Sequence, residues 1–499
     1  MILAICEFFA FYLTFQILYT RYGSSLRTIP GPFFASFSNV LKVLAVYKDA
    51  MPQWNIAVHR KYGSVVRIGP KHVSFSSPEA LQIIHGSRQA YPKSDFYKPT
   101  AANFEGAPLL NLFAVQDVNY HSSLKKTIGG LYTKAAVLEL ESKIDLCMKM
   151  FIDQMRKQSH EINPTNLDIS LWVHLFSFDC LGELNVSKTF GFMETGKDFN
   201  GMIEGSDRIL AITGLYAQAP LLQGIRWIKG NLWAPKGLNP VLKYTASALR
   251  ERLEKPTETP DMLNNFLRLR EAQPDKISMR DITGSIYINL MAGHDVLAVT
   301  LRAILYYVAR TPRVETKLRT ELGSLYSNYA LSDIIPYAEL TKLSYLGAVI
   351  NESLRIHGNL GLVNERVTPA EGAIIDGFKI PGGTIVGINP WVIHRNTEIY
   401  GEDVDVFRPE RWLDASEAEI ENMKRNLFSF GAGPRMCIGK NIAMVQIYKF
   451  ITGFYRHFSA KLTHPEQDWN VVGNWVTKQT GMDMLVTQLG RNVATEAHS

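Results

Sequence analysis

One long apolar segment constrains the fold of this chain more than any other feature. Residues 281–310 carry helical periodicity from Asp281 to just before Pro312. A helix of this length would run roughly 45 Å, which is enough to cross the core of a large domain. The segment therefore predicts a central helix around which other elements pack.

The remaining periodicity is also mostly helical, with boundaries at Asp, Pro or Gly. The predicted helices span 137–158, 242–253, 313–326 and 438–458. Short alternating or β-branched runs predict a few small sheets, at 64–68, 72–75, 373–380 and 384–388. Because strands and helices do not alternate regularly, we expect a mainly α fold with small β-sheets rather than a doubly wound parallel sheet.

The length of 499 residues suggests about three domains, on a prior of roughly 150 residues each. No low-complexity spacer or internal repeat divides the chain. The most linker-like stretch, 254–260, is short enough to be a surface loop. With 46% hydrophobic and 20% charged residues, the chain can bury enough surface to fold, so disorder is not favoured.

Charge and metal-binding patterns exclude several function classes. The formal net charge of +6 includes no run of five or more Lys or Arg, so we expect no nucleic-acid binding. The four cysteines, at 6, 147, 180 and 437, form no CxxC pair, which argues against a disulfide scaffold or a zinc ribbon. Because no HExxH pair occurs among the 12 histidines, zinc catalysis is not favoured either.

The N-terminus predicts a membrane anchor over residues 1–20. Residues 2–19 are apolar and, as a helix, would span about one hydrocarbon thickness, with Glu7 near the end that the interface can reach. Arg21 and Arg27 follow this stretch and no Lys or Arg precedes it, so the rest of the chain is expected in the cytosol. A buried apolar helix is the alternative. Residues 21–34 are expected to form a stiff Pro/Gly-rich hinge.

The most informative motif is the loop 428–439, FSFGAGPRMCIG, which ends in Cys437 at the start of an apolar helix. A helix N-terminus stabilises anionic sulfur, so we expect a lowered pKa for this cysteine. Gly431, Gly433 and Gly439 would let the backbone approach a large planar group. The glycine spacing does not fit a phosphate-binding P-loop.

Phe430, Gly433, Cys437 and Gly439 stand at the spacing FxxGxxxCxG. This spacing resembles the haem-binding loop of the cytochrome P-450 family, whose iron is held by a cysteine thiolate. The resemblance implies haem b (iron protoporphyrin IX) as cofactor, with Cys437 as the axial ligand of the iron. It also implies the cytochrome P-450 fold, a single large haem-binding domain over residues 35–499 in place of three domains.

Two further segments match the family. Glu352 and Arg355, at i and i+3, match its ExxR motif, and FRPERW at 407–412 resembles the segment whose arginine, here Arg411, joins that pair. An exposed pair at this spacing would be a weak surface ion pair. The resemblance implies instead a buried charge network that holds the chain beneath the haem, which is a structural role.

The resemblance also offers four partners for the haem carboxylates. Arg435 lies two residues before Cys437, and Arg366 follows the extended segment after the ExxR helix. His121 and Lys125 stand where many family members have Trp and Arg. Both can donate hydrogen bonds, although neither has the planar fork of an arginine. For Lys125, a solvated surface lysine is the alternative.

The central helix contains AGHDVL at 292–297, which resembles the distal-helix motif AGxDTT. In that motif a glycine, here Gly293, makes room for dioxygen, and an acid followed by a hydroxyl delivers protons. Asp295 keeps the acid, but Val296 stands at the first Thr position and cannot hydrogen-bond. Thr300, one turn further, could replace the hydroxyl only in a locally distorted helix. A substrate hydroxyl or an ordered water organised by Asp295 is the preferred substitute.

The resemblance is strongest to microsomal fungal members of the pisatin demethylase-like and benzoate hydroxylase-like groups. It implies a haem-thiolate monooxygenase with a single-pass anchor in the endoplasmic reticulum membrane and a catalytic domain that faces the cytosol. The expected substrate is a small lipophilic molecule of fungal secondary-metabolite biosynthesis, with dioxygen as co-substrate. We expect a monomer. The Trp- and cation-containing stretch 221–233 is expected at the membrane interface.

No flavin or nicotinamide fingerprint occurs, so electrons are expected from a separate NADPH–cytochrome P-450 reductase. Basic residues would dock it, with Lys125, Lys126 and Lys440 as candidates. Two alternatives stay open. Val296 also suits a redox-neutral or peroxide-dependent haem-thiolate enzyme that catalyses rearrangement, cyclisation or dehydration. A non-catalytic haem carrier or sensor is less favoured.

Overall fold

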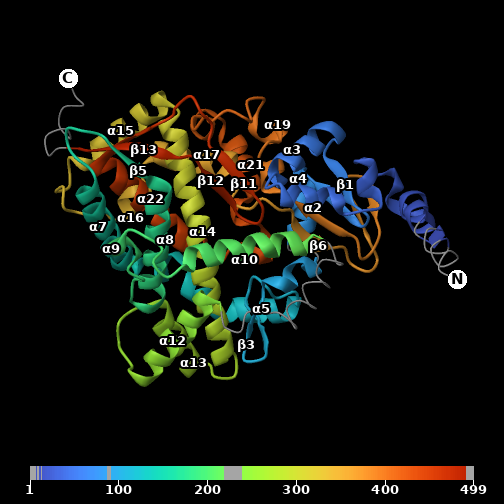
Figure 1. Ribbon diagram of the computed structural model, residues 1–499, viewed down its shortest axis with the longest axis horizontal. Coiled ribbons are helices and arrows are strands. Elements are labelled where there is room, and N and C mark those ends of the chain that lie inside the picture. Colours follow the sequence, from blue (N-terminus) through green and yellow to red (C-terminus); the bar gives the residue numbers. More distant parts are fainter. Residues whose placement is uncertain (1–6, 8–10, 13, 87–90, 219–238, 490–499) are drawn as a thin grey trace.

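The structure is a computed structural model that describes residues 7, 11–12, 14–86, 91–218 and 239–489. Its central element is helix α14, Met279–Ala309, which runs through the middle of the molecule (Figure 1). Ser278 caps this helix in a capping box with Asp281, which explains why the helix begins where the sequence predicted. Most of its side chains are buried, because helices surround it.

The helical part of the structure packs around α14. Its long helices are α7 (Glu141–Gln158), α8 (Ile169–Val186), α10 (Met202–Ala217), α12 (Pro240–Glu254), α13 (Met262–Ala272), α15 (Pro312–Tyr326), α17 (Ser344–Ile356) and α22 (Lys440–His457). Among them, α8, α12, α13, α15, α17 and α22 pack directly on α14. The predicted segment 137–158 divides into two helices, α6 (Lys134–Leu138) and α7, because the chain turns at residues 139–140.

Shorter helices connect these elements. They are α2 (Val40–Tyr47), α3 (Met51–Tyr62), α4 (Pro78–His85), α5 (Val118–Ile128), α9 (Phe192–Thr195), α16 (Tyr337–Leu340), α18 (Pro390–Ile393), α19 (Thr397–Tyr400), α20 (Arg411–Asp414) and α21 (Glu417–Asn426). Two turns of 3-10 helix, η6 (Phe428–Phe430) and η7 (Gly433–Arg435), lie just before α22. The described part of the chain is therefore mainly helical, as predicted.

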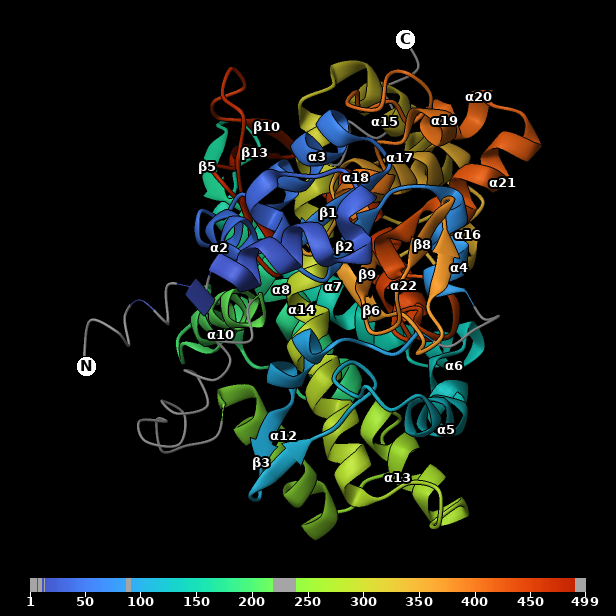
Figure 2. The ribbon, with the colours of Figure 1, turned by 90° about the vertical axis from the view of Figure 1, so that its right-hand side faces the viewer.

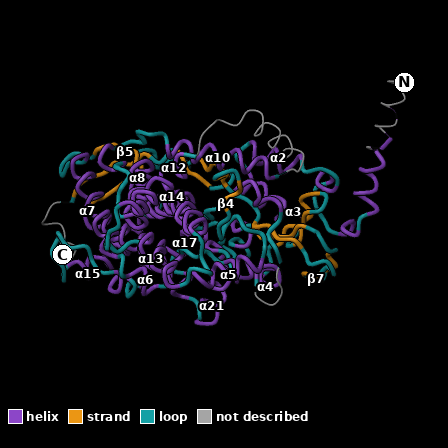
Figure 3. Tube along the Cα trace, turned by 90° about the horizontal axis from the view of Figure 1, so that it is seen from below, coloured by secondary structure: helices purple, strands orange, loops and turns teal. Residues whose placement is uncertain are grey.

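The strands form small, separate sheets. The largest has the order β1 (Val65–Gly69), β2 (His72–Phe75), β9 (Ile385–Ile388) and β6 (Asn364–Val367). It packs with α2, α3 and α4, and Figure 2 shows these elements from the side. Only the β2–β9 pair in this sheet is parallel. A second sheet has the order β10 (Phe458–Leu462), β13 (Asp483–Gln488) and β5 (Thr165–Asp168). These sheets leave most of the molecule to helices (Figure 3).

Three two-stranded hairpins complete the described strands. They are β3 (Ala102–Phe104) with β4 (Ala107–Leu109), β7 (Ala373–Ile375) with β8 (Phe378–Ile380), and β11 (Asn470–Gly473) with β12 (Thr477–Thr480). The predicted run 373–380 thus folds as two strands. Asp376 and Gly377 both adopt positive φ, which reverses the chain between the strands.

The predicted anchor lies largely outside the described residues, since positions 1–6, 8–10 and 13 are not part of them. Described residues between 7 and 18 are helical and include exposed Phe11, Tyr12 and Phe15. Within the described ranges, only α14 is long and apolar enough to cross a membrane, and it is mostly buried in the protein. The predicted interface stretch 221–233 also falls outside the described residues.

Candidate functional site

The loop that carries Cys437 is held in a tight conformation between η6 and α22. The backbone N–H of Cys437 donates to the carbonyl of Phe430 at 2.8 Å, which closes the loop. Gly433 has φ +60°, and a Cβ atom there would overlap the carbonyl oxygen of His85. This position therefore accepts only glycine, both for its backbone angle and for its close approach to α4.

Cys437 is exposed, whereas the other two described cysteines are buried. Enough protein surrounds it, however, that burial raises the pKa of its thiol above the ordinary value. Hydrogen bonds from the N–H groups of Gly439 and Lys440 oppose this, as do the charges of Lys125 and Lys440. The prediction of a lowered pKa for the Cys437 thiol is therefore wrong. The cost of burying a thiolate exceeds the stabilisation that it receives at the start of α22.

Glu352 joins the two arginines that the sequence singled out. Arg355 donates to both of its carboxylate oxygens, at 2.7 and 2.8 Å, and Arg411 Nε donates at 3.0 Å. Trp412 Nε1 and the Arg408 N–H also donate to this carboxylate. The side chains of Glu352 and Arg355 are fully buried. Burial would raise the pKa of Glu352, but the arginines outweigh it and hold the pKa below its usual value.

The same network is linked to the cysteine loop through His394 and Leu354. Arg355 donates to the carbonyl of His394 at 2.9 Å, and His394 Nε2 accepts from the Phe428 N–H at 2.8 Å. Ser429 donates to the carbonyl of Leu354, which lies next to Arg355 in α17. The Glu/Arg pair of α17 therefore fixes both the chain after α18 and the start of the cysteine loop.

Three cations converge near the cysteine loop. Lys93, Arg366 and Arg435 are close enough that the charges of both arginines, together with burial, hold the pKa of Lys93 well below its usual range. Burial and Arg366 lower the pKa of Arg435 to about 10. None of the three forms an ion pair with an acidic side chain of the described residues. They donate hydrogen bonds to backbone carbonyls, for example from Arg435 to Val115 and Gln116, and Arg366 also bonds the Tyr97 side chain.

His121 and Lys125, both on α5, lie at the edge of this group. His121 is buried, and burial together with Arg435 lowers its pKa to about 3, so its imidazole is neutral at pH 7. The Lys125 ammonium donates to the carbonyls of Pro434 and Met436, at 2.7 and 3.0 Å. It is thus turned into the cysteine loop, where its charge acts on the sulfur, and is not free at the surface.

Sequence reasoning missed Lys93. No spacing marks this residue, which precedes an ordinary turn beginning at Ser94. Only the fold brings it to Arg366 on β6 and to Arg435 on η7. Its ammonium also lies over the rings of Tyr97 and Phe113, 4.2 and 4.4 Å from their centroids, which helps to accommodate a buried charge.

These residues fit the group that the sequence implied. Cys437 is exposed although protein surrounds it closely, so it can serve as an axial ligand. Glycine at 433 leaves the loop without a side chain at that position. Three cations without acidic partners suit a ligand that carries two carboxylates. The donor set therefore fits a haem.

Helix α14 carries the remaining residues that the sequence singled out. One side of this helix, its open face, is partly exposed. Ala292 is exposed, and Ile288, Asn289, Gly293 and Val296 around it are half-buried. A Cβ atom at Gly293 would lie 2.7 Å from Leu181 Cδ1 of α8. The close packing of α14 on α8 therefore also favours a small residue at position 293, and the role of Gly293 in making room for dioxygen stays a prediction.

Asp295 is buried and turned toward α8 and β12. Its Oδ1 atom lies 3.2 Å from His174 Nε2 and 2.9 Å from Lys478 Nζ, yet neither carboxylate oxygen receives a hydrogen bond of normal geometry. Burial raises the pKa of Asp295 to about 7, with the charge of Arg302 opposing. This carboxyl can therefore gain and lose a proton near neutral pH.

Thr300 cannot replace the missing hydroxyl in this structure. Its Oγ1 atom donates to the Val296 carbonyl at 2.9 Å and accepts from Asn359 Nδ2 at 3.0 Å. α14 is an unbroken α-helix through this region. The hydroxyl is thus committed to the backbone and to Asn359, and Val296 itself offers no donor.

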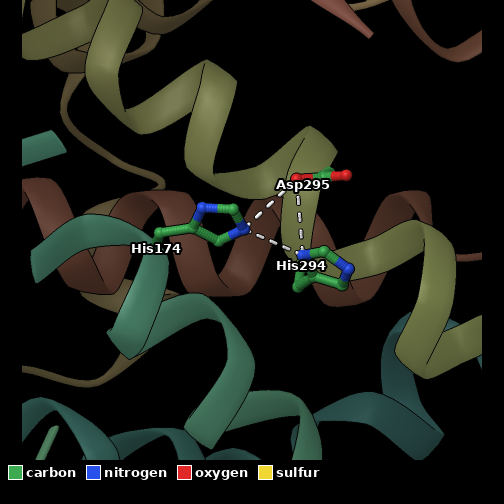
Figure 4. Close-up of side chains that lie close together, drawn as sticks. All are labelled: His174, His294 and Asp295. Carbon is green, nitrogen blue, oxygen red and sulfur yellow. Dashed lines mark hydrogen bonds and ion pairs between the residues drawn. The ribbon is translucent and has the colours of Figure 1, made fainter. Parts of the chain in front are cut away.

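Two histidines complete the surroundings of Asp295 (Figure 4). His174 Nε2 lies 2.9 Å from His294 Nδ1, and Arg302 approaches His174 Nδ1 at 3.4 Å. Because Arg302 can only donate, His174 carries its proton on Nε2 and donates to His294, whose own proton is then on Nε2. The His294 ring stacks on Phe178 with centroids 3.8 Å apart.

His174, His294 and Asp295 each place one ligand atom within 4.8 Å of the others, as a metal site would. Two cations oppose that use, since Lys478 contacts the Asp295 carboxylate and Arg302 contacts His174. A metal ion would be repelled by both charges. The cluster is therefore better described as a buried polar network.

Comparison with known proteins gives a consistent result. Residues 30–486 match the family described as Cytochrome P-450. A cytochrome P-450 monooxygenase of Aspergillus terreus is 35% identical to this chain over 89% of its length and 92% of the relative's. A cytochrome P-450 monooxygenase of Emericella nidulans is 32% identical, over 94% and 95% of the two chains. The pisatin demethylase of Fusarium vanettenii is 33% identical, over 92% and 88%.

Proposed function

The chain belongs to the cytochrome P-450 family as a cytochrome P-450 monooxygenase, and we propose that it oxidises a small lipophilic molecule at a haem b held by Cys437. The observation that carries this proposal is the cysteine loop, which combines an exposed thiol, a position that accepts only glycine, and a buried charge network that holds the loop in place. We further propose that residues 35–499 form one catalytic domain.

Each residue of the loop region has a role in this proposal. Cys437 would be the axial ligand of the iron, with Phe430, Gly433 and Gly439 shaping the loop around it. Lys125 would stabilise both the loop, through its carbonyls, and the anionic sulfur, through its charge. When bound, the haem supplies the activation of dioxygen, with the thiolate as electron donor.

The haem carboxylates would be bound by Arg366, Arg435 and Lys93. Binding would replace backbone carbonyls as the partners of these cations and would neutralise their mutual repulsion. Neutral His121 would add a hydrogen bond. We propose a structural role for the network of Glu352, Arg355 and Arg411, because it is linked to the loop through His394 and through the Leu354 carbonyl.

On α14, the proposed role of Asp295 is to hold a proton at a carboxylate oxygen and, because its side chain is turned toward α8 and β12, to pass that proton to the open face through an intervening group. Val296 cannot take part, since it lacks a hydroxyl. A substrate hydroxyl or an ordered water beside Val296 would then carry the proton from Asp295. The raised pKa of Asp295 supports this role, because an acid that titrates near 7 is half protonated at neutral pH.

Electrons would come from a separate NADPH–cytochrome P-450 reductase. Of the three proposed docking lysines, Lys126 and Lys440 are exposed, whereas Lys125 is turned into the loop. The proposed location is the endoplasmic reticulum membrane, with the anchor over 1–20. The proposed setting, fungal secondary-metabolite biosynthesis, is supported by the fungal origin of the relatives.

Reconstitution with haem and reductase tests this function. We expect the carbon monoxide difference band that is the signature of cysteine-thiolate ligation, and NADPH consumption that depends on substrate. Cys437→Ser should abolish the band while the circular dichroism of the protein is unchanged. A wild-type protein that folds and binds haem without this band would refute the thiolate assignment.

A second function, redox-neutral or peroxide-dependent chemistry, is favoured by one observation: neither Val296 nor Thr300 offers a free hydroxyl. Turnover without reductase would support it. Val296→Thr separates the two, because a restored hydroxyl should raise product per NADPH and lower peroxide leakage in a monooxygenase. If both quantities stay the same, position 296 has no part in proton delivery.

A further inference from the structure

Lys478 stands between the buried acid of α14 and the surface. From β12, its ammonium lies 2.9 Å from Asp295 Oδ1 and also pairs with Asp207 of α10. The exposed fraction of the three side chains rises along this path, from 1% for Asp295 to 18% for Lys478 and 39% for Asp207. The three residues thus form a continuous line of ionisable groups from the core to solvent.

The other charged and titratable groups around Asp295 do not provide such a path. From α8, His174 faces the carboxylate, but its second nitrogen contacts Arg302. His294 is fully buried, and its Nε2 atom has no hydrogen-bond partner in the described part of the chain. Burial lowers the pKa of both histidines, so both stay neutral at pH 7. Among these neighbours, only Lys478 also contacts a group that is exposed.

We propose that Lys478 is the positioning residue that supplies protons from solvent to Asp295, with Asp207 holding its ammonium in place. This proposal rests on the proposed function, in which Asp295 releases protons toward the open face of α14. The Lys478 ammonium gives one proton to the Asp295 carboxylate and becomes a neutral amine. A proton taken up from bulk solvent beside Asp207 then reprotonates the amine, and Asp295 passes its own proton on, so both groups regain their starting charge in each cycle.

The energetics of the pair suit this transfer. Burial lowers the pKa of Lys478 to about 7 and raises that of Asp295 to about 7, and the two groups lie 2.9 Å apart. Donor and acceptor with similar pKa values exchange a proton at little cost, and values near the working pH are the most effective. An arginine at position 478 would keep the charge but could not release a proton at neutral pH.

The Lys478→Arg variant therefore distinguishes a fixed charge from a proton donor. The full-length holoenzyme with reductase is compared as wild type, Lys478→Arg, Lys478→Met and, as a control, Arg208→Gln. Arg208 follows Asp207 on α10 but forms only an exposed pair with Glu204. We expect both Lys478 variants to lose about 100-fold in product formation, the lower end of what positioned proton transfer contributes. NADPH consumption should continue with release of peroxide, and the control should match the wild type.

The pattern among variants separates proton supply from a structural ion pair. If Lys478→Arg keeps the product rate and pH profile of the wild type, the lysine serves only as a fixed charge and the proposal is wrong. It is equally wrong if Lys478→Met keeps them. Because Lys478→Arg preserves the positive charge between Asp207 and Asp295, its loss of activity with an unchanged carbon monoxide band would support the proposal.

A second readout does not depend on activity. The infrared band of a protonated carboxyl, identified by its absence in Asp295→Asn, should titrate near neutral pH in the wild type. In Lys478→Met its midpoint should move to higher pH, because the buried carboxylate loses the one cation that contacts it within the described residues. An unchanged midpoint would show that the two groups are not coupled. This measurement stands even if the wild type shows no substrate-dependent NADPH consumption, which would instead refute the proposed function.

Discussion

Replacing Glu352 with glutamine tests whether the buried charge network holds the cysteine loop. Glutamine has nearly the same shape, but it is neutral and places an NH₂ group against arginine donors. In the wild type, the Glu352 carboxylate receives hydrogen bonds from Arg355, Arg411, Trp412 and the backbone of Arg408. The substitution therefore leaves two buried guanidinium groups without their shared anion.

The expected cost follows from these contacts. Breaking a buried ion pair by removing one partner costs about 3–5 kcal/mol, because it leaves an uncompensated charge. Here Arg411 still pairs with Asp403 at 2.8 Å, and Arg355 keeps the backbone carbonyls of His394 and Val404. We therefore expect a loss at the lower end of this range, about 3 kcal/mol in the free energy of unfolding.

The chain contains a matched control at the same i, i+3 spacing. Glu339 pairs with Lys342 at 2.7 Å, but the lysine side chain is 67% exposed. Such pairs contribute about 1 kcal/mol or less, so Glu339→Gln should have little effect. Urea unfolding of both variants, followed by circular dichroism and by the carbon monoxide band, measures the difference. If Glu352→Gln unfolds within about 1 kcal/mol of Glu339→Gln, the network does not stabilise the loop in the way described.

Three further outcomes are expected. Lys93→Met should lower the haem retained per protein during gel filtration, whereas Lys98→Met at an exposed site should not, and equal retention would remove Lys93 from the cofactor site. Gly433→Ala should weaken haem binding through its positive φ and overlap, while Gly323→Ala, which meets open space, should be tolerated in the same assay. Asp295→Asn should gain stability over the wild type as pH rises from about 4 to 7, by up to about 4 kcal/mol. In the wild type, burial raises the pKa of Asp295 to about 7, so the folded protein keeps the neutral acid up to that pH. The unfolded chain loses this proton from about pH 4, so the wild type loses stability between about pH 4 and 7, whereas the amide does not titrate. Urea unfolding at several pH values measures this gap, and a constant gap would contradict it.

The sequence by itself determined the elements whose signals are local. The apolar periodicity of 281–310 placed α14 to within two residues, because a helix repeats its pattern along the chain. The spacing of the cysteine loop identified Cys437 and the family, and the i, i+3 spacing placed Glu352 and Arg355 on one face of α17. Each of these features needs only neighbouring residues to be recognised.

Only the tertiary structure decided how distant residues meet. Lys93 joins two arginines from other elements, Lys478 reaches Asp295 from β12, and Gly293 packs close to Leu181 of α8. The pKa of Cys437 depends on the same level, because burial is summed over every element around the thiol. A pattern along the chain contains no information on these sums, so the charges and protons of the site become visible only when the helices are packed together.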